Sequence, residues 1–256
     1  MLRNLQSRVG DFIESCANVL SLLIRNFGVV FKIKIGFDLF CMLIFSDFDG
    51  TLAQNDVGDA LIKKFGDWPE CEKAVQRWIR GEISSREYYE VAASTMRVNQ
   101  EQLNDFCDAQ PLAPGFLEFA AFCRQQNWPL LVLSDGLDYY IQRLLARHGL
   151  DLPVFANHLE LVTPDRIEIS FPYFEHSCGR CANCKGYHVR RLAKPHEKIV
   201  YIGDGYSDRC GAQEADIIFA KGDLAKWCEE KAREYFRLEN FENVLNWLKE
   251  GRVENG

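Results

Sequence analysis

The chain has 256 residues, of which 47% are hydrophobic, and its formal net charge is −7. This length suits one large α/β domain or a core with a smaller second domain, and the apolar fraction supports a substantial core. The acidic balance argues against nucleic acid as a partner, because phosphate-backbone binding needs clustered lysine and arginine. Ten cysteines are scattered along the chain, several inside predicted strands or helices. Such usage is typical of a reduced, cytoplasmic protein rather than of a disulfide framework.

Residues 1–41 precede the first predicted strand and are weakly basic, in contrast to the acidic remainder. We expect them to be an extension from a misassigned start or a poorly ordered appendage, because Met42 already lies inside the first predicted strand. The alternative is an amphipathic helix over residues 9–25 that lies on a membrane surface. Charged side chains interrupt the apolar stretch of residues 27–45, so no membrane span is expected there.

The first predicted strand is the apolar run of residues 41–45, and two carboxylates follow directly after it. Asp47 and Asp49 are one residue apart, and Gly50 then ends the strand pattern. Open α/β sheets bind their ligands at the carboxyl ends of strands. A carboxylate there can act as a covalent nucleophile, and a second one nearby can transfer protons. A solvated Asp-Gly turn is the alternative interpretation of these residues.

Residues 55–112 are predicted to form a helical insertion. Apolar side chains recur there at helical spacing, and Ser84 with Glu87 forms a capping signal before one of the helices. Prolines and a glycine then mark the return of the chain to the core. The predicted organisation is a core made of residues 42–54 and 113–256, into which the helical segment is inserted.

Two further predicted strands also end in polar residues. The strand over residues 131–133 leads to Ser134, and the strand over residues 199–202 leads to Asp204 and then Asp208. Carboxylates from separate strand ends form an oxygen-rich site. Such a site suits Mg²⁺, which prefers one or two carboxylates together with water and substrate phosphate.

The remaining predicted elements are a hairpin and a final helix. Residues 157–173 alternate between apolar and polar side chains around a Thr-Pro-Asp turn, which predicts a β-hairpin beside the core sheet. Residues 241–248 predict an amphipathic helix. Its apolar side either packs on the core or forms a homodimer, and the sequence leaves both alternatives open.

A cysteine-rich segment leads into Lys185, which begins a predicted helix. The lysine charge can offset the repulsion between an attacking carboxylate and a phosphate. Cys178, Cys181, Cys184 and His188 offer four ligands at a spacing that suits Zn²⁺. The alternative is a tight loop that positions the lysine and carries buried or incidental thiols.

Taken together, these motifs resemble those of the haloacid dehalogenase superfamily of phosphatases. The resemblance is carried by the Asp47-x-Asp49-Gly-Thr motif, Ser134, Lys185 and the Gly-Asp204-Gly-x-Ser-Asp208 motif. It implies a doubly wound α/β core with an inserted all-helical cap. It also implies Mg²⁺-dependent hydrolysis of a phosphomonoester.

The resemblance implies a catalytic role for several of these residues. Asp47 would attack phosphorus and form an aspartyl-phosphate. Asp49 would protonate the leaving oxygen and then activate the water that hydrolyses the intermediate. Thr51 would help to fix the loop and, with Ser134 and Lys185, would form the phosphate-binding set.

A metal-binding set is implied in the same way. Mg²⁺ would be bound by Asp47, by the backbone carbonyl of Asp49 and by Asp204. Asp208 would support the waters on the metal or orient Lys185. The carboxylate attack on an anionic phosphate is opposed by charge repulsion, which the cations reduce.

The helical insertion resembles the cap of the phosphoserine phosphatase-like branch of this superfamily. Asp56 occupies the place of an acidic residue that follows the first motif in that branch. Phosphoserine phosphatases grip the substrate carboxylate with a cap arginine, and Ala92 lies near that place here, although other arginines of the insertion could substitute. Residues 47–56, residues 81–87 and the Cys-Lys pair at 184–185 resemble more closely the phosphatases of the methionine salvage pathway, which act on an enolised methylthio-ketose phosphate.

The expected substrate is therefore a small phosphorylated metabolite, with the methionine-salvage enol phosphate as the first candidate. Phosphoserine, phosphocholine and phosphoethanolamine are the alternatives. Residues 134–136 read Ser-Asp-Gly, whereas Ser-Gly-Gly is common in that branch. This difference at Asp135 leaves the subfamily open. A phosphotransferase or a non-catalytic phosphometabolite-binding protein is a second alternative. The intact Asp47, Asp49, Lys185 and Asp204 argue against binding alone.

Overall fold

The computed structural model describes residues 42–250, which include a seven-stranded sheet in the order β4-β3-β2-β1-β5-β6-β7. The expectations for residues 1–41, including the surface helix over residues 9–25, lie outside the described residues. The strands are β1 (Met42–Ser46), β2 (Leu130–Leu137), β3 (Val154–Thr163), β4 (Arg166–Ser170), β5 (Lys198–Gly203), β6 (Ile217–Ala220) and β7 (Phe236–Arg237).

The first strand is the centre of the sheet. β1 pairs in parallel with β2 on one side and with β5 on the other, and all five of its residues are buried. Strands buried on both faces are expected to be continuously apolar, as the Met-Leu-Ile-Phe run of β1 is. The parallel pairing brings the carboxyl ends of β1, β2 and β5 to the same edge, where the polar residues predicted from the sequence follow.

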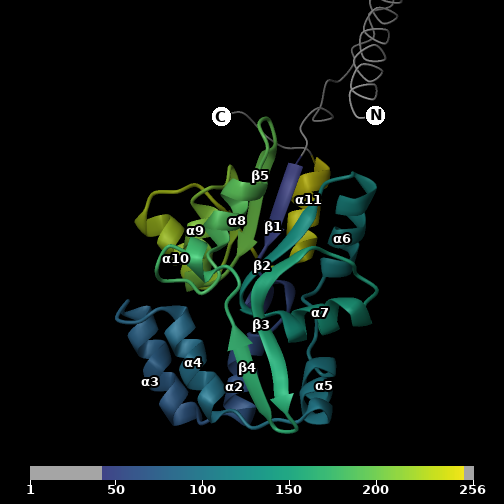
Figure 1. The fold of residues 1–256 in the computed structure, drawn as a ribbon. Helices are drawn as coiled ribbons and strands as arrows, with labels where there is room; N and C mark the ends of the chain where they lie inside the picture. Colours follow the sequence, from purple (N-terminus) through teal and green to yellow (C-terminus); the bar gives the residue numbers. More distant parts are fainter. Residues whose placement is uncertain (1–41, 251–256) are drawn as a thin grey trace, which may run out of the picture. The chain divides into compact units, whose positions relative to one another are not determined.

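Helices cover both faces of the sheet. In Figure 1, α6, α7 and α11 lie to one side of the strands and α8, α9 and α10 lie to the other. The predicted doubly wound α/β core is therefore confirmed. These helices are α6 (Phe116–Gln125), α7 (Asp138–Arg147), α8 (Lys185–Leu192), α9 (Arg209–Ala212), α10 (Gly222–Glu230) and α11 (Phe241–Glu250).

Four helices form the segment of residues 55–112, which was predicted to be helical. They are α2 (Val57–Phe65), α3 (Trp68–Ile79), α4 (Ser85–Thr95) and α5 (Gln100–Asp108). The capping signal is confirmed, because the Ser84 amide donates to the Glu87 carboxylate at 2.7 Å while the Glu87 amide donates to Ser84 Oγ at 3.3 Å. The division of the chain into a cap and a core stays a prediction.

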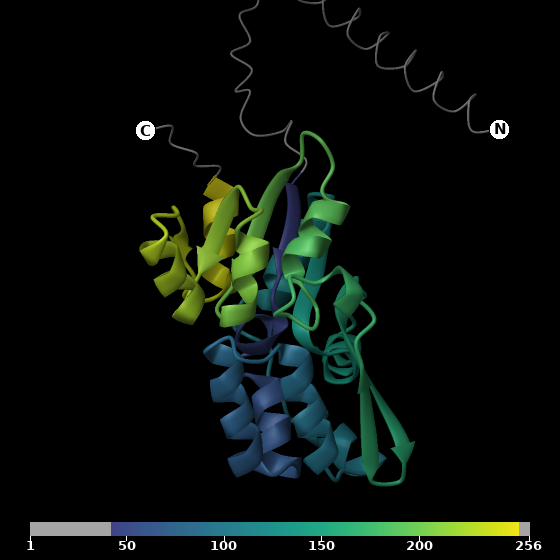
Figure 2. The ribbon, with the colours of Figure 1, turned by 60° about the vertical axis from the view of Figure 1, so that its left-hand side comes forward.

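The predicted hairpin consists of β3 and β4, which pair in antiparallel fashion. Figure 2 shows it extending from the sheet along the side of the inserted helices. The Arg86 guanidinium of α4 lies 4.8 Å from the centre of the Phe174 ring, which follows β4 in the turn η2 (Phe174–His176). The Val98 amide, between α4 and α5, also donates to the carbonyl of Asp165 in the hairpin turn at 3.0 Å, so the hairpin contacts the helical insertion.

The last helix packs its apolar side within the chain. The buried residues of α11 are Phe241, Val244, Leu245 and Leu248. The centre of the Phe241 ring lies 4.9 Å from the ring centre of Phe116 and 5.1 Å from that of Phe119, both on α6. Packing on the core is thus confirmed for this helix, and the homodimer stays a prediction. Within residues 42–250, no helix has both the length and the apolar character of a membrane span.

Replacing Phe241 tests the importance of this aromatic contact. We expect Phe241→Ala to lower the free energy of unfolding by about 3–5 kcal/mol, because a buried phenyl ring is lost and a cavity remains. The control is Leu117→Ala on the neighbouring helix, whose side chain is 42% exposed. Chemical denaturation of both variants would measure the difference, and equal losses would contradict this packing.

Candidate active site

The Asp49 carboxylate is held in place by four hydrogen bonds. Its Oδ1 accepts from the backbone amides of Val57 and Gly58 at 3.1 Å each, where α2 begins. Its Oδ2 accepts from Ser134 Oγ at 3.1 Å and from the Tyr140 hydroxyl at 2.8 Å. Burial raises the pKa of Asp49, although these hydrogen bonds act in the opposite direction. A fixed carboxyl with a raised pKa suits proton transfer.

Lys185 joins two carboxylates that are distant in the sequence. Its ammonium Nζ lies 2.5 Å from Asp47 Oδ1 and 2.5 Å from Asp208 Oδ1, and the lysine side chain has no exposure to solvent. Burial alone would lower the pKa of Lys185, but Asp208 and Asp47 outweigh it and raise that pKa. For Asp47, burial and repulsion from Asp208 raise the pKa, and Lys185 partly offsets them. The lysine is therefore a positive charge beside Asp47.

Asp208 uses both carboxylate oxygens inside the protein. Besides Lys185, its Oδ1 accepts from the Tyr201 hydroxyl at 2.7 Å. Its Oδ2 accepts from the backbone amides of Asp204 at 3.0 Å and Gly205 at 2.8 Å. Because these contacts occupy the carboxylate, Asp208 orients Lys185 and the Asp204 loop. Its predicted role in supporting the waters on a metal stays a prediction.

Asp204 lies directly beside the turn η1 (Phe48–Leu52) that follows β1. Its Oδ1 accepts from Thr51 Oγ1 at 3.0 Å. Gly50 has a φ of 70°, and a Cβ at that position would lie 2.6 Å from Asp204 Oδ2, so only glycine fits. The Thr51 hydroxyl is directed at the carboxylate, and its phosphate-binding role stays a prediction.

The carboxylates of this site fit a hard divalent cation. Oxygens of Asp47, Asp204 and Asp208 all lie within 4.8 Å of one another. Since the protein already occupies both oxygens of Asp208, Asp47 and Asp204 are the residues that could hold the ion. One or two carboxylates completed by water are typical of Mg²⁺. The Asp49 side chain is engaged elsewhere, which leaves its backbone carbonyl as the predicted third ligand.

Three polar residues that the sequence did not reveal as functional connect α4 with the core. The Asp135 carboxylate accepts from Ser85 Oγ at 2.7 Å and from the Asn183 amide at 2.7 Å. Ser85 Oγ in turn accepts from the Ala182 amide at 2.6 Å. The sequence marks Asp135 only as a departure from a family pattern, and it gives no functional signal for Ser85. Their shared network is visible only in three dimensions.

A cavity of about 480 Å³ opens onto these residues. Asp47, Asp49 and Ser134 form one part of its wall, and helices α2–α4 form much of the rest. The lining also includes Asp56, Asp59, Trp78, Tyr88, Tyr89, Tyr206 and Lys226. Asp56 also caps α2 by accepting from the Asp59 amide at 2.8 Å. The wall is thus rich in acidic and aromatic side chains, with Lys226 as a basic one.

The predicted zinc ligands are only partly brought together. Cys178, Cys181 and Cys184 cluster with Cys210. The prediction for His188 is wrong, because its Nε2 lies 2.6 Å from Asn183 Oδ1 and its ring is buried. Cys210 is separated from the others in sequence and shares no ligand spacing with them, so no local pattern could identify it.

The raised pKa values predict how stability depends on pH. Burial raises the pKa of Asp204 to about 6 and that of Asp135 to about 6, from an ordinary value of 3.8. A carboxyl whose pKa is raised by folding stabilises the fold when protonated, and that contribution disappears as the pH rises from about 4 through about 6. Without added Mg²⁺, Tm should therefore rise as the pH is lowered from 8 towards 5. Added Mg²⁺ should raise Tm more at pH 8, because it replaces protons at Asp204.

Calorimetry with and without added Mg²⁺ would measure both effects. In Asp204→Asn the gain from Mg²⁺ should be lost. An equal gain in Tm at pH 5 and pH 8 would contradict a shared site for protons and metal.

Comparison with known proteins agrees with this geometry. The model of the haloacid dehalogenase-like hydrolase family matches residues 44–213. A 2-hydroxy-3-keto-5-methylthiopentenyl-1-phosphate phosphatase of Brevibacillus brevis is 30% identical over 220 residues, which cover 83% of this chain and 97% of the relative. The phosphatase of the same name from Bacillus cereus (strain ATCC 10987) is 29% identical over 210 residues, or 80% of this chain and 95% of that protein.

A solved structure shows the same fold. It is described as a phospho-aspartyl intermediate analogue of phosphoserine phosphatase, and it superposes with a TM-score of 0.64 at 18% identity over 81% of this chain and 99% of the other. The family match covers most of the described residues, including all the strand ends discussed above. The sequence-based prediction of a phosphatase-type enzyme is confirmed, and the chain belongs to the haloacid dehalogenase-like hydrolase family.

Proposed function

We propose that this enzyme hydrolyses the phosphate ester of a small metabolite through an aspartyl-phosphate on Asp47. The observation that carries the proposal is the meeting of Asp47 and Asp49 at the wall of one cavity, with the ammonium group of the buried Lys185 in contact with Asp47. Asp47 is held 2.5 Å from the lysine, and the Asp49 carboxyl is fixed by four hydrogen bonds. Asp47 as nucleophile, Asp49 as proton-transfer group and Lys185 as cation together suit the transfer of a phosphoryl group.

Each residue contributes one part of the reaction. An Asp47 oxygen forms the bond to phosphorus while the bond to the leaving oxygen breaks. Asp49 gives a proton to that leaving oxygen and later takes one from the water that cleaves the aspartyl-phosphate. The Lys185 charge and the Ser134 hydroxyl face the negative charge on the phosphoryl oxygens. Mg²⁺ held by Asp47 and Asp204 would lower the repulsion between the carboxylate and the phosphate.

For the substrate we propose the enol phosphate named in the bacterial relatives. Trp78 and Tyr206 line the cavity with their rings 6.0 Å apart, which suits an uncharged chain that ends in a thioether. Phosphoserine is less well matched. Within the described residues no arginine lines this cavity to bind a carboxylate in a two-pronged contact, and Lys226 is the basic residue of its lining. Asp56 and Asp59 would repel a substrate carboxylate.

A phosphorylated amino alcohol is the second candidate. Asp59 and the rings of Tyr88 and Tyr89 lie on the same wall. Aromatic faces and carboxylates attract ammonium groups, so phosphocholine or phosphoethanolamine would place its cation there.

We also propose that helices α2–α5 are the cap that selects the substrate. A cytoplasmic location agrees with the unpaired state of every cysteine within residues 42–250.

Removal of the nucleophile tests the chemical step. Asp47→Asn should lower kcat by more than about 10⁴-fold, because the amide cannot form the phosphoenzyme. Asp49→Asn should lower kcat by about 10²–10⁴-fold, the usual contribution of a proton-transfer group. Phosphate release with Mg²⁺ measures both, with Asp151→Asn on an exposed loop as the control.

An acid quench of the wild-type reaction with radiolabelled phosphate ester should leave label on the peptide that contains Asp47. Label on an acceptor other than water at the end of the reaction would identify a phosphotransferase. Full activity in Asp47→Asn would contradict the proposed mechanism.

A pair of cavity variants distinguishes the two substrate candidates. If the methylthio enol phosphate is the substrate, Trp78→Ala should lower kcat/KM for it about tenfold, mainly through KM, since an aromatic contact is lost. Asp59→Asn should leave that value within about threefold. If phosphocholine is the substrate, Asp59→Asn should cause the larger loss. Steady-state kinetics on both compounds and on phosphoserine would decide between them.

A further inference from the structure

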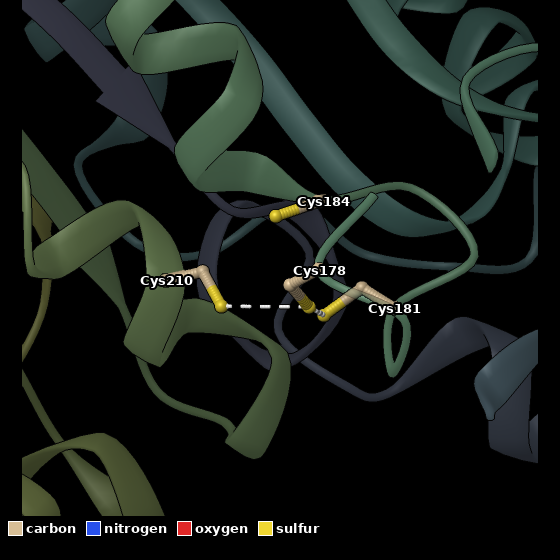
Figure 3. A group of neighbouring side chains, drawn as sticks. All are labelled: Cys178, Cys181, Cys184 and Cys210. Carbon is tan, nitrogen blue, oxygen red and sulfur yellow. Dashed lines mark hydrogen bonds between the residues drawn. The ribbon is translucent and has the colours of Figure 1, made fainter. Parts of the chain in front are cut away.

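Four thiols from two separate segments converge outside the catalytic cavity. Cys178, Cys181 and Cys184 lie in the loop before α8, and Cys210 lies on α9 (Figure 3). All four sulfur atoms lie within 4.8 Å of one another. Figure 3 shows the side chains pointing towards a common centre. We propose that these four cysteines bind one structural Zn²⁺ ion.

The sulfur-to-sulfur distances fit a single tetrahedral ion. The Sγ atoms of Cys178 and Cys181 are 3.6 Å apart, and those of Cys178 and Cys210 are 3.9 Å apart. Four thiolates at about 2.3 Å from zinc are separated by about 3.8 Å at tetrahedral angles. A disulfide would need about 2.05 Å. The observed spacing therefore leaves room for an ion at the centre and does not form a disulfide.

The ligand set also distinguishes the kind of metal. Four sulfurs in a tetrahedral arrangement bind zinc or iron, whereas Mg²⁺ prefers oxygen. A cluster of several iron atoms distributes its cysteines over different irons, which requires wider separation than the four sulfurs show here. With four protein ligands no position stays open for water or substrate, so the ion has a structural role.

The position of the site explains what such an ion would hold together. Cys184 immediately precedes Lys185 at the start of α8, and Cys210 follows Asp208 by two residues. Gly186 lets the two segments meet, because a Cβ there would lie 2.5 Å from the Cys210 carbonyl oxygen. A shared ion would thus fix the segment that carries the buried lysine against the segment that carries its carboxylate partner.

The same loop reaches the inserted helices. The Ser85 amide of α4 donates to the Arg180 carbonyl at 2.8 Å, and Arg180 Nη2 donates to the Trp78 carbonyl at 2.9 Å. Both contacts come from the stretch between Cys178 and Cys184. Zinc would therefore also hold the loop that supports α4 beside the cavity. This inference concerns metal content and does not depend on the proposed reaction.

The first test is the metal content of the full chain, purified without a metal column. Elemental analysis should find about one zinc per chain. X-ray absorption at the zinc edge should show four sulfur neighbours at about 2.3 Å and no nitrogen. These measurements use the wild-type protein, so they do not depend on whether a variant folds.

The second test uses matched variants in competition with a chromophoric zinc chelator. Cys210→Ser and Cys181→Ser should lower zinc affinity by at least about 100-fold, because each removes one ligand. Cys71→Ser should leave the affinity unchanged, since Cys71 lies on α3 with its sulfur 3.6 Å from Thr95 Oγ1, where a hydroxyl also fits. Removal of zinc from the wild type should lower Tm by about 10 °C.

Four outcomes would overturn the inference. The first is a chain that is fully folded with no bound metal. The second is iron in place of zinc. The third is a disulfide among the four cysteines, seen as a lower mass in the unreduced protein. The fourth is nitrogen in the absorption spectrum, which would mean that the ion does not have the four cysteines as its ligands.

Discussion

An ammonium group that has no contact with solvent lies between two carboxylates at the carboxyl edge of the sheet. A charge in this position loses its hydration, and only close partners of opposite sign can compensate. Lys185 has such partners in Asp47 and Asp208, each 2.5 Å away. Loss of one partner from a buried pair typically costs about 3–5 kcal/mol. The surrounding strands must therefore be arranged so that both carboxylates lie beside the ammonium group.

The sheet order satisfies this constraint. Asp47 follows β1 and Asp208 follows β5, and the two strands are parallel neighbours. Their ends lie at the same edge, so the two carboxylates meet without a long loop. Asp208 also accepts hydrogen bonds from Tyr201 and from the amides of its own loop. A carboxylate with this many donors holds the lysine at a fixed position, and the lysine in turn holds Asp47 at the cavity wall.

Hydrogen bonds extend this order from the core to the inserted helices. Ser85, Asp135 and Asn183 form a buried network in which the polar atoms mostly satisfy one another. Asp135 occupies a place where glycine is common in the branch that the sequence resembles. Its carboxylate provides two acceptors that a glycine lacks, and it uses them to join α4 to the loop before Lys185. Position 135 thus links α4 at the cavity wall with the loop before Lys185.

The sequence alone determined the central strand, the helical insertion, the hairpin and the motif residues at the strand ends. These features depend on local periodicity and on residues that are adjacent to strand ends, which a single sequence displays directly. Only the tertiary structure decided which distant side chains meet. It placed Cys210 beside the Cys178 loop, turned His188 into the core, and joined Tyr140 to Asp49 and Tyr201 to Asp208. Contacts of this kind arise from the packing of separate elements, and no spacing along the chain encodes them.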